Sequence, residues 1–325
     1  MTKRDRLQKL TNTQGVVAAM AIDQRGSLKK ALGAALGRDA TTEDIEVFKE
    51  VCVEVLTPYA SAVLLDSEFG LPALRKKNAD TGVLLAYEKT GYDVTVRGRL
   101  PDLLDGYSAA RLREEGADAV KLLVYYDSFD TDEVNNQKKH FIRQVGDECT
   151  REAMPFFLEI VSYSDTIGDE KSLEFAKKKP EMVMGYMKEF SDPMYGVDVL
   201  KVEMPFNIKY VAGSSAFVGG ESAYSHDEVL EIIRKAASTT TLPFIYLSAG
   251  VTIDVFLESL ALVREAGVTY NGVLCGRATW QDGIKAYGAG GVDGLRTWLK
   301  DVGVQNIQKV NEELELGAAG INMLA

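Results

Sequence analysis

Charged side chains interrupt several stretches of this sequence that are otherwise apolar. Lys121 lies within AVKLLVYY, Glu159 within PFFLEIV and Lys201 within VDVLKVEMP. A charged group in an apolar strand costs free energy unless it is paired or loses its charge, so these positions are candidates for chemistry. Other polar residues stand at the ends of further apolar runs: Asp23, Asp66, Glu88, Glu203, Ser248 and Arg277.

Lys201 has the most informative surroundings. Alternation along a strand places it on the same face as Val199 and Glu203, while the opposite face is entirely apolar. The lysine then points away from the covering helices, where desolvation or a second cation lowers the pKa of its ammonium group. A neutral amine in that setting is a nucleophile for a ketone carbonyl. The alternative is a lysine paired with an inward carboxylate for charge balance alone.

Glu159 is predicted on the strand next to that of Lys201. An apolar setting raises the pKa of a carboxylic acid towards neutrality, which suits a general acid and base. Its alternative role is the counter-ion of Lys201 or Lys121. Lys121 can be a second buried cation that lowers the pKa of Lys201, or the nucleophile itself. Asp23 ends the first strand, where its carboxylate can bind a substrate hydroxyl or the lysines.

Two strand ends carry the features of a phosphate site. LSAG at 247–250 supplies the hydroxyl of Ser248, and LCGRATW at 274–280 supplies the guanidinium of Arg277. Glycine lets backbone N–H groups approach an anion, and arginine binds phosphate through two hydrogen bonds. The loops after the seventh and eighth strands bind phosphate in many barrel enzymes. The alternative is that both segments are ordinary turns.

Hydrophobic periodicity predicts the elements that position these residues. Near-continuous apolar runs are typical of parallel strands covered on both faces, and amphipathic stretches lie between them. Several of those stretches end in glycine before the next run, as at Gly116 and Gly267, which is typical of a helix-to-strand turn. Eight strands are predicted: 16–23, 62–66, 82–88, 119–126, 155–161, 197–204, 243–249 and 271–276.

Eight such units predict an α/β fold, the (β/α)₈ TIM barrel. The chain is expected to form a single domain over residues 1–325, with a short N-terminal helix and a C-terminal helical tail from Trp280. An open, doubly wound sheet is the rival. It is weakened because the segment DQRG, and no GxGxxG fingerprint, follows the first strand.

Composition restricts the partners and the compartment. Acidic residues outnumber basic ones by 48 to 37, for a net charge of −11, which argues against a nucleic-acid or anionic-membrane partner. No window approaches the roughly 18 apolar residues of a membrane span. The start, MTKRDRLQKL, lacks the apolar core of a secretory signal. Three scattered cysteines fit a reducing compartment, so we expect a cytoplasmic protein.

Histidine is scarce, which restricts the metal chemistry. His140 and His226 are the two histidines, and both lie in polar, helix-like segments. No Cys-x-x-Cys pair is present, so a zinc site made mainly from histidine or cysteine is not expected. A zinc-dependent mechanism is therefore the weakest option for chemistry on a ketone.

Five segments together resemble the tagatose-1,6-bisphosphate aldolase family. These class I aldolases act in the tagatose 6-phosphate route of lactose and galactose breakdown. The resemblance runs in collinear order from about residue 15 to about residue 300, and sulfofructosephosphate aldolases share part of it. The segments are AIDQRG at 21–26, LLAYEKTGYD at 84–93, VLKVEMP at 199–205, YLSAGV at 246–251 and NGVLCGRATW at 271–280.

The resemblance implies a (β/α)₈ fold without a metal or other cofactor. It implies reversible cleavage of a phosphorylated ketohexose, D-tagatose 1,6-bisphosphate, to dihydroxyacetone phosphate and D-glyceraldehyde 3-phosphate. Family analogy also implies a homodimer. Carried onto this sequence, the roles are Schiff-base formation by Lys201, acid and base catalysis by Glu159, support by Lys121 and Asp23, substrate contacts by Gln24 and Arg25, and phosphate binding by Ser248, Gly250, Gly276 and Arg277.

Several functions share these residues. The same chemistry serves fructose 1,6-bisphosphate or sulfofructose 1-phosphate, which differ from tagatose bisphosphate in a hydroxyl configuration or in the distal anion. A metabolite-sensing regulatory protein that retains the pocket is an alternative of another class. It predicts ligand binding with negligible turnover. Retention of both Lys201 and Glu159 favours catalysis.

Overall fold

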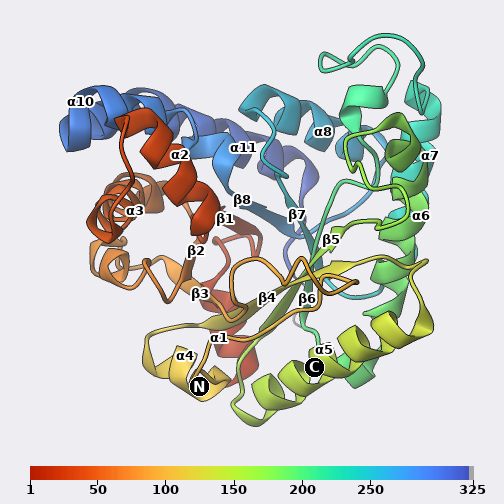
Figure 1. Ribbon diagram of the computed structural model, residues 1–325, viewed down its shortest axis with the longest axis horizontal. Coiled ribbons are helices and arrows are strands. Elements are labelled where there is room, and N and C mark those ends of the chain that lie inside the picture. The colour runs from red at the N-terminus through yellow and green to blue at the C-terminus, as the bar shows by residue number, and fades with distance from the viewer. Residues whose placement is uncertain (322–325) are drawn as a thin grey trace.

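A computed structural model describes residues 1–321 as a closed barrel of eight parallel strands, ordered β1 to β8 around the ring, with helices outside (Figure 1). The predicted TIM barrel is confirmed, and the open sheet is excluded because β1 pairs with β8. The strands are β1 Val17–Ala21, β2 Ala62–Asp66, β3 Gly82–Ala86, β4 Ala119–Tyr126, β5 Phe156–Ser162, β6 Val199–Val202, β7 Phe244–Leu247 and β8 Gly272–Cys275.

Helices occupy most of the connections between strands. Within residues 1–321, no helix has the length and apolar character to span a membrane. The α-helices are α1 Lys3–Lys9, α2 Gly26–Leu36, α3 Thr42–Leu56, α4 Ala109–Glu114, α5 Asp132–Arg151, α6 Leu173–Glu189, α7 His226–Ala237, α8 Ile253–Glu265, α9 Arg277–Trp280, α10 Gly283–Trp298 and α11 Val304–Gly317. Shorter helical turns are η1 Thr57–Tyr59, η2 Pro72–Lys76, η3 Pro193–Tyr195, η4 Ile208–Tyr210 and η5 Leu299–Gly303.

Two connections differ from the regular pattern. Only the 3₁₀ turn η2 lies between β2 and β3. In the amphipathic stretch before β4, helix α4 begins only at Ala109. Gly106 adopts a φ of +71°, and Ser108 caps the helix by accepting a hydrogen bond from the Arg111 N–H. The long β3–α4 loop that results lies over the barrel mouth. The predicted C-terminal helical tail contains α10 and α11, and residues 322–325 lie outside the described residues.

Strand alternation divides the core into two layers. Leu200 and Val202 pack in the outer layer between strands and helices, as the sequence predicted for that face of β6. Ala119, Phe157 and Val199 belong to a separate cluster inside the barrel. The charged residue two positions further along each of these three strands shares the inner face. The barrel is therefore apolar at its base and charged towards the carboxyl ends of the strands.

Helix α1 closes the base of the barrel. Leu10, which follows it, is fully buried in the inner cluster. Lys3 Nζ lies 2.7 Å from Asp198 Oδ2, and Lys9 Nζ lies 3.1 Å from Asp118 Oδ1. These two acidic residues directly precede β6 and β4, so the ion pairs fasten α1 to the amino ends of the strands. The opposite, carboxyl end is the end that is left open.

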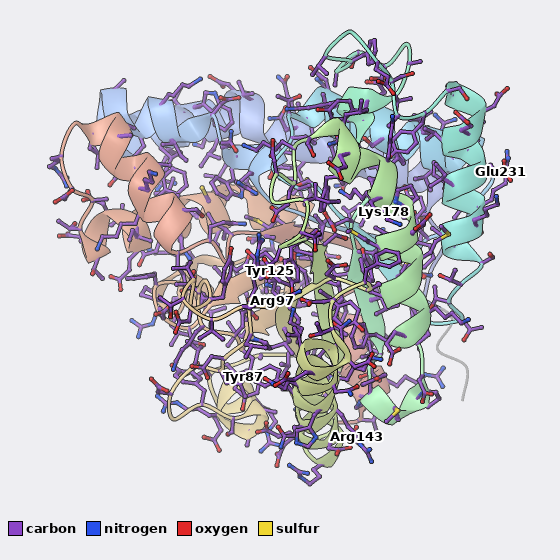
Figure 2. The ribbon with its side chains drawn as sticks, turned by 45° about the vertical axis from the view of Figure 1, so that its right-hand side comes forward. Tyr87, Arg97, Tyr125, Arg143, Lys178 and Glu231 are labelled. Carbon is purple, nitrogen blue, oxygen red and sulfur yellow. The ribbon has the colours of Figure 1, made fainter. Side chains whose placement is uncertain are left out.

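Charged side chains cover the outer surface of the helices. Figure 2 shows Arg143 and Glu231 pointing away from the barrel, on α5 and α7 respectively, and both are exposed. Several helix starts are capped: Thr41 and Ser225 each accept a hydrogen bond from a first-turn N–H and form a capping box. Such caps define where the helices begin and so the lengths of the loops that reach the barrel mouth.

Substitution of Gly272 tests how β1 and β8 pair to close the barrel. This glycine has a φ of +132°, and an added Cβ would collide with the carbonyl oxygen of Val17, its neighbour on β1. We expect Gly272→Ala to lower the free energy of unfolding by more than about 4 kcal/mol, because both the backbone and the strand pairing must shift. Thermal or urea unfolding measures the change.

Gly267→Ala is the matched control. Gly267 also has a positive φ, of +70°, but its Cβ would meet no atom within 4 Å. Only the backbone strain of a left-handed residue applies, about 1–2 kcal/mol. Equal losses in the two variants would contradict the assignment of Gly272 to barrel closure.

Candidate active site

A cavity of about 460 Å³ opens at the carboxyl ends of the strands. Its walls come from residues far apart in the sequence, including the β1–α2 turn, the β3–α4 loop and the turns after β7 and β8. The inner-face charges of the strands form its floor. The lining includes all ten residues to which the family resemblance gives a role: Asp23, Gln24, Arg25, Lys121, Glu159, Lys201, Ser248, Gly250, Gly276 and Arg277.

Lys201 and Glu159 form a buried pair on the cavity floor. The two residues are register partners on the adjacent strands β6 and β5. Lys201 Nζ lies 2.9 Å from Glu159 Oε2, and the two side chains are 4% and 8% exposed. Proton exchange between an amine and a carboxylate needs this kind of contact.

Lys121 lies among three carboxylates. Its Nζ is 2.9 Å from Asp23 Oδ2, 2.7 Å from Glu88 Oε1 and 2.8 Å from Glu159 Oε2, and its side chain is fully buried. Burial opposes the charged form, but the three carboxylates outweigh it and raise the pKa of Lys121 well above its ordinary value. Lys121 is therefore a permanent ammonium group at the centre of the site.

The same contacts act on the carboxylates. Burial raises the pKa of Glu159, but the ammonium groups of Lys121 and Lys201 outweigh burial and lower that pKa. Asp23 responds in the same way to the two lysines, and its pKa is also lowered. The prediction that an apolar setting raises the pKa of Glu159 is wrong, because β5 lies beside two cationic strands. In the resting site Glu159 is a carboxylate and thus a proton acceptor.

The turns after β7 and β8 form a cradle with open hydrogen-bonding groups. The Gly276 N–H donates to Ser248 Oγ at 3.3 Å, which joins the two turns. Gly250 has a φ of +72°, and a Cβ there would lie 2.5 Å from the guanidinium carbon of Arg277. The positive φ favours glycine here, and the missing Cβ leaves room for the guanidinium group. Arg277 is exposed and has no acidic partner among residues 1–321, so its charge faces the cavity unneutralised.

The turn after β1 holds polar atoms that lack partners. Arg25 lies 3.0 Å from Glu68 and 3.8 Å from Glu88, but its Nε atom is buried without a hydrogen-bond partner. The Oε1 atom of Gln24 is also buried and unpaired among the described residues. Buried polar atoms without partners are costly. Both residues line the cavity, so a polar ligand there can satisfy them.

Sequence reasoning gave no role to several residues of the site. Glu88 accepts a hydrogen bond from the Leu123 N–H and forms an ion pair with Lys121. These contacts orient the lysine. Arg99 lines the cavity from the irregular β3–α4 loop, where no periodic pattern marks it. Asp66, although noted at a strand end, does not line the cavity, because it pairs with the buried Lys49 of α3.

Comparisons with known proteins agree with the fold and identify the family. The structure is similar to a fructose-bisphosphate aldolase from Plasmodium falciparum, with a TM-score of 0.71 over 98% of this chain and 95% of that one. At 16% sequence identity this likeness shows the fold alone, that of the (β/α)₈ barrels. The chain belongs to the DeoC/LacD family of aldolases, whose model matches residues 17–282. The family resemblance predicted from the sequence is confirmed.

Curated relatives extend the match over nearly the whole chain. A tagatose 1,6-diphosphate aldolase of Listeria monocytogenes serotype 4b is 50% identical, covering 97% of this chain and 92% of its own length. Tagatose 1,6-diphosphate aldolase 2 of Enterococcus faecalis is also 50% identical, covering 98% and 95%. A tagatose 1,6-diphosphate aldolase of Staphylococcus aureus is 49% identical, covering 95% and 94%.

Removal of the central cation tests its role in holding the site together. Lys121→Met leaves Asp23, Glu88 and Glu159 buried with one positive charge fewer. We expect the free energy of unfolding at neutral pH to fall by about 3–5 kcal/mol, as for other buried ion pairs that lose one partner. Urea unfolding at neutral pH measures this loss.

The pH dependence of the same variant gives a second readout. In the wild-type protein the lowered pKa values of Asp23 and Glu159 contribute stability that is present above their ordinary pKa values and lost in acid. In Lys121→Met we expect burial to dominate and raise those pKa values, so that the folded state binds more protons than the unfolded state. Stability should then fall as the pH rises from about 5 to about 7. A variant with the wild-type pH profile would contradict this account.

Proposed function

We propose that the protein is a class I aldolase that reversibly cleaves D-tagatose 1,6-bisphosphate through a Schiff base on Lys201. The products are dihydroxyacetone phosphate and D-glyceraldehyde 3-phosphate. The observation that carries the proposal is the unequal pairing of two buried lysines: Lys121 contacts three carboxylates, and Lys201 contacts one. The names of the curated relatives support the choice of sugar.

The unequal pairing favours Lys201 over Lys121 as the nucleophile. An amine must lose its proton before it attacks a carbonyl. The carboxylates around Lys121 hold its proton, and its raised pKa makes the neutral amine rare at neutral pH. Among residues 1–321, Glu159 is the one acidic residue within salt-bridge distance of Lys201. Lys121 then acts as the second cation, close to Lys201 through the shared oxygen of Glu159.

Glu159 can carry every proton that the reaction moves. It first takes the ammonium proton of Lys201, and the neutral amine adds to the C2 ketone. The protonated Glu159 returns its proton to the departing water, and the iminium forms. The carboxylate then removes the proton of the C4 hydroxyl, the C3–C4 bond breaks, and its electrons pass to the imine as an enamine. Protonation at C3 and hydrolysis release the second product.

Other cavity residues position the sugar in this scheme. The cradle of Ser248, Gly250, Gly276 and Arg277 lies after β7 and β8, next to the strand of Lys201, and suits the 1-phosphate. Gln24 and Arg25 offer unpaired atoms to sugar hydroxyls or phosphate. Asp23 and Lys121 hold hydroxyl groups and keep the charges of the site balanced.

We propose further that the enzyme works in the cytoplasm as a homodimer. Its three cysteines, Cys52, Cys149 and Cys275, are free and buried, which suits a reducing compartment. Analogy with the family supports the dimer. The substrate, a phosphorylated ketohexose, is the small-molecule partner.

Borohydride trapping tests the nucleophile. We expect sodium borohydride with dihydroxyacetone phosphate to reduce an imine and leave one covalent adduct, found by peptide mass spectrometry on Lys201. Lys201→Met should give no adduct and no turnover, while Glu159→Gln should lose most turnover because the proton relay is broken. An adduct on Lys121, or inhibition by a chelator, would contradict the proposal. Ligand binding without turnover would favour the sensing protein.

A panel of sugars tests the substrate. We expect the highest kcat/KM with D-tagatose 1,6-bisphosphate, compared with D-fructose 1,6-bisphosphate and sulfofructose 1-phosphate. All three release dihydroxyacetone phosphate, so one coupled assay measures them side by side. Tagatose and fructose differ in the C4 hydroxyl, the group that Glu159 must deprotonate, and one misplaced hydrogen bond there costs rate. A higher value for another sugar would reassign the substrate but keep the chemistry.

A further inference from the structure

We propose that Arg99 binds the phosphate at the end of the substrate remote from the β7–β8 cradle. The inference rests on the proposed function, since it requires a sugar with a phosphate at each end. Arg99 lies outside every strand and helix, in the loop between β3 and α4, and its side chain lines the cavity. Three observations favour this role: the position of Arg99 in the ring of strands, the aromatic rings that hold its side chain, and the exposed carboxylate with which it pairs.

The side chain of Arg99 is supported by three aromatic rings. Its guanidinium carbon lies 5.0 Å from the ring centre of Tyr92, 5.4 Å from that of Tyr125 and 4.6 Å from that of Tyr163. Tyr125 is on β4, and Tyr163 follows β5 (Figure 2 shows Tyr125). Rings that contact the face of a guanidinium hold its plane and leave its N–H edge free for a ligand. This arrangement orients Arg99 before a ligand arrives.

The backbone of Arg99 is strained and fastened from both sides. Arg99 has a φ of +47°, in the left-handed region that side-chain-bearing residues avoid, and Gly98 before it has +95°. The Gly98 N–H donates to Asp165 Oδ2 at 3.2 Å, and the Tyr163 hydroxyl donates to the Gly98 carbonyl at 3.0 Å. The same hydroxyl accepts a hydrogen bond from the buried Lys138 at 2.9 Å. Strain held in this way is characteristic of ligand-binding sites.

The order of the strands places Arg99 on the side of Lys201 that lies away from the β7–β8 cradle. In a ring of eight strands, β3 and β4 face β7 and β8 across the barrel, and β5 and β6 lie between. With the 1-phosphate after β7 and β8, C2 lies over Lys201 on β6. The C4 hydroxyl then lies over Glu159 on β5. The carbon chain continues towards β4 and β3, so the 6-phosphate arrives where Arg99 lies.

The other cations near the cavity are also paired with carboxylates. Arg25 pairs with the buried Glu88 as well as with Glu68, on the β1 side of the site. Lys89 lies on the exposed rim between two carboxylates, at 2.7 and 2.9 Å. Within residues 1–321, Arg99 Nη1 lies 2.5 Å from Glu170 Oε1, and Arg99 Nε lies 3.9 Å from Asp165 Oδ1, at the outer limit of an ion pair.

Glu170 occupies the place of an anion beside Arg99. Its side chain is 40% exposed at the rim, so it can turn into water at little cost, whereas Arg99 is 15% exposed and held by the rings. A phosphate carries more charge and more acceptor oxygens than a carboxylate and is the stronger partner for the guanidinium fork. The 6-phosphate therefore replaces Glu170 when substrate enters.

Calorimetric titration of Lys201→Ala proteins tests the assignment without turnover. The ligands are D-tagatose 1,6-bisphosphate and D-tagatose 1-phosphate. We expect an added Arg99→Met to weaken bisphosphate binding by about 10- to 100-fold, the loss of hydrogen bonds to a charged group, and to leave 1-phosphate binding unchanged. Arg97→Met is the matched control. Arg97 is two positions away in the same loop, 60% exposed and outside the cavity lining, so neither affinity should change.

A second variant, Glu170→Gln, tests whether the 6-phosphate replaces Glu170 beside Arg99. It is informative even if Arg99→Met does not fold. We expect Glu170→Gln to tighten bisphosphate binding several-fold, because Arg99 loses the nearer of its two carboxylates, and to leave 1-phosphate binding unchanged. An equal loss of both ligands in Arg99→Met would mean that Arg99 only supports the loop, and would overturn the assignment. Bisphosphate that binds no better than 1-phosphate to the Lys201→Ala parent would also overturn it. Failure of the proposed function is read separately, as absence of a borohydride adduct on Lys201 in the wild-type enzyme.

Discussion

One ammonium group inside the barrel is the constraint on which the site depends. Lys121 is fully buried and pairs with three carboxylates that come from β5 and from the turns after β1 and β3. Burial alone would raise the pKa values of Asp23 and Glu159. The ammonium groups of Lys121 and Lys201 outweigh burial and lower both pKa values. Glu159 then acts as a base towards Lys201, and Asp23 presents a charged oxygen to the cavity.

The barrel makes this cluster possible by its geometry. Alternation along parallel strands puts small and apolar residues inside at the base and charges one step higher on the same face. Helix α1 and its ion pairs close the base. Closure between β1 and β8 requires the glycine at 272. Lys201 and Glu159 lie on paired strands, so the reacting lysine and its base keep a fixed relation to each other.

Much of the fold could be predicted from sequence because its signals are local. Apolar runs located all eight strands, and a charge within such a run located Lys121, Glu159 and Lys201, since a buried charge is rare enough to need a reason. The pKa of Glu159 was predicted in the wrong direction, because it depends on which strands become neighbours in space. Arg99 and the role of Glu88 were missed because irregular loops carry no periodicity. Their contacts depend on which elements become neighbours in space.

The two buried lysines have different roles: Lys121 stays charged among its carboxylates, and Lys201 forms the covalent bond with the substrate. A crystal structure of the enzyme soaked with dihydroxyacetone phosphate and reduced with borohydride tests both roles at once. The account predicts continuous electron density from Lys201 Nζ to C2 of the ligand, with Lys121 still in contact with Asp23, Glu88 and Glu159. Density that joins the ligand to Lys121, or a Lys121 released from its carboxylates when the ligand binds, would contradict it.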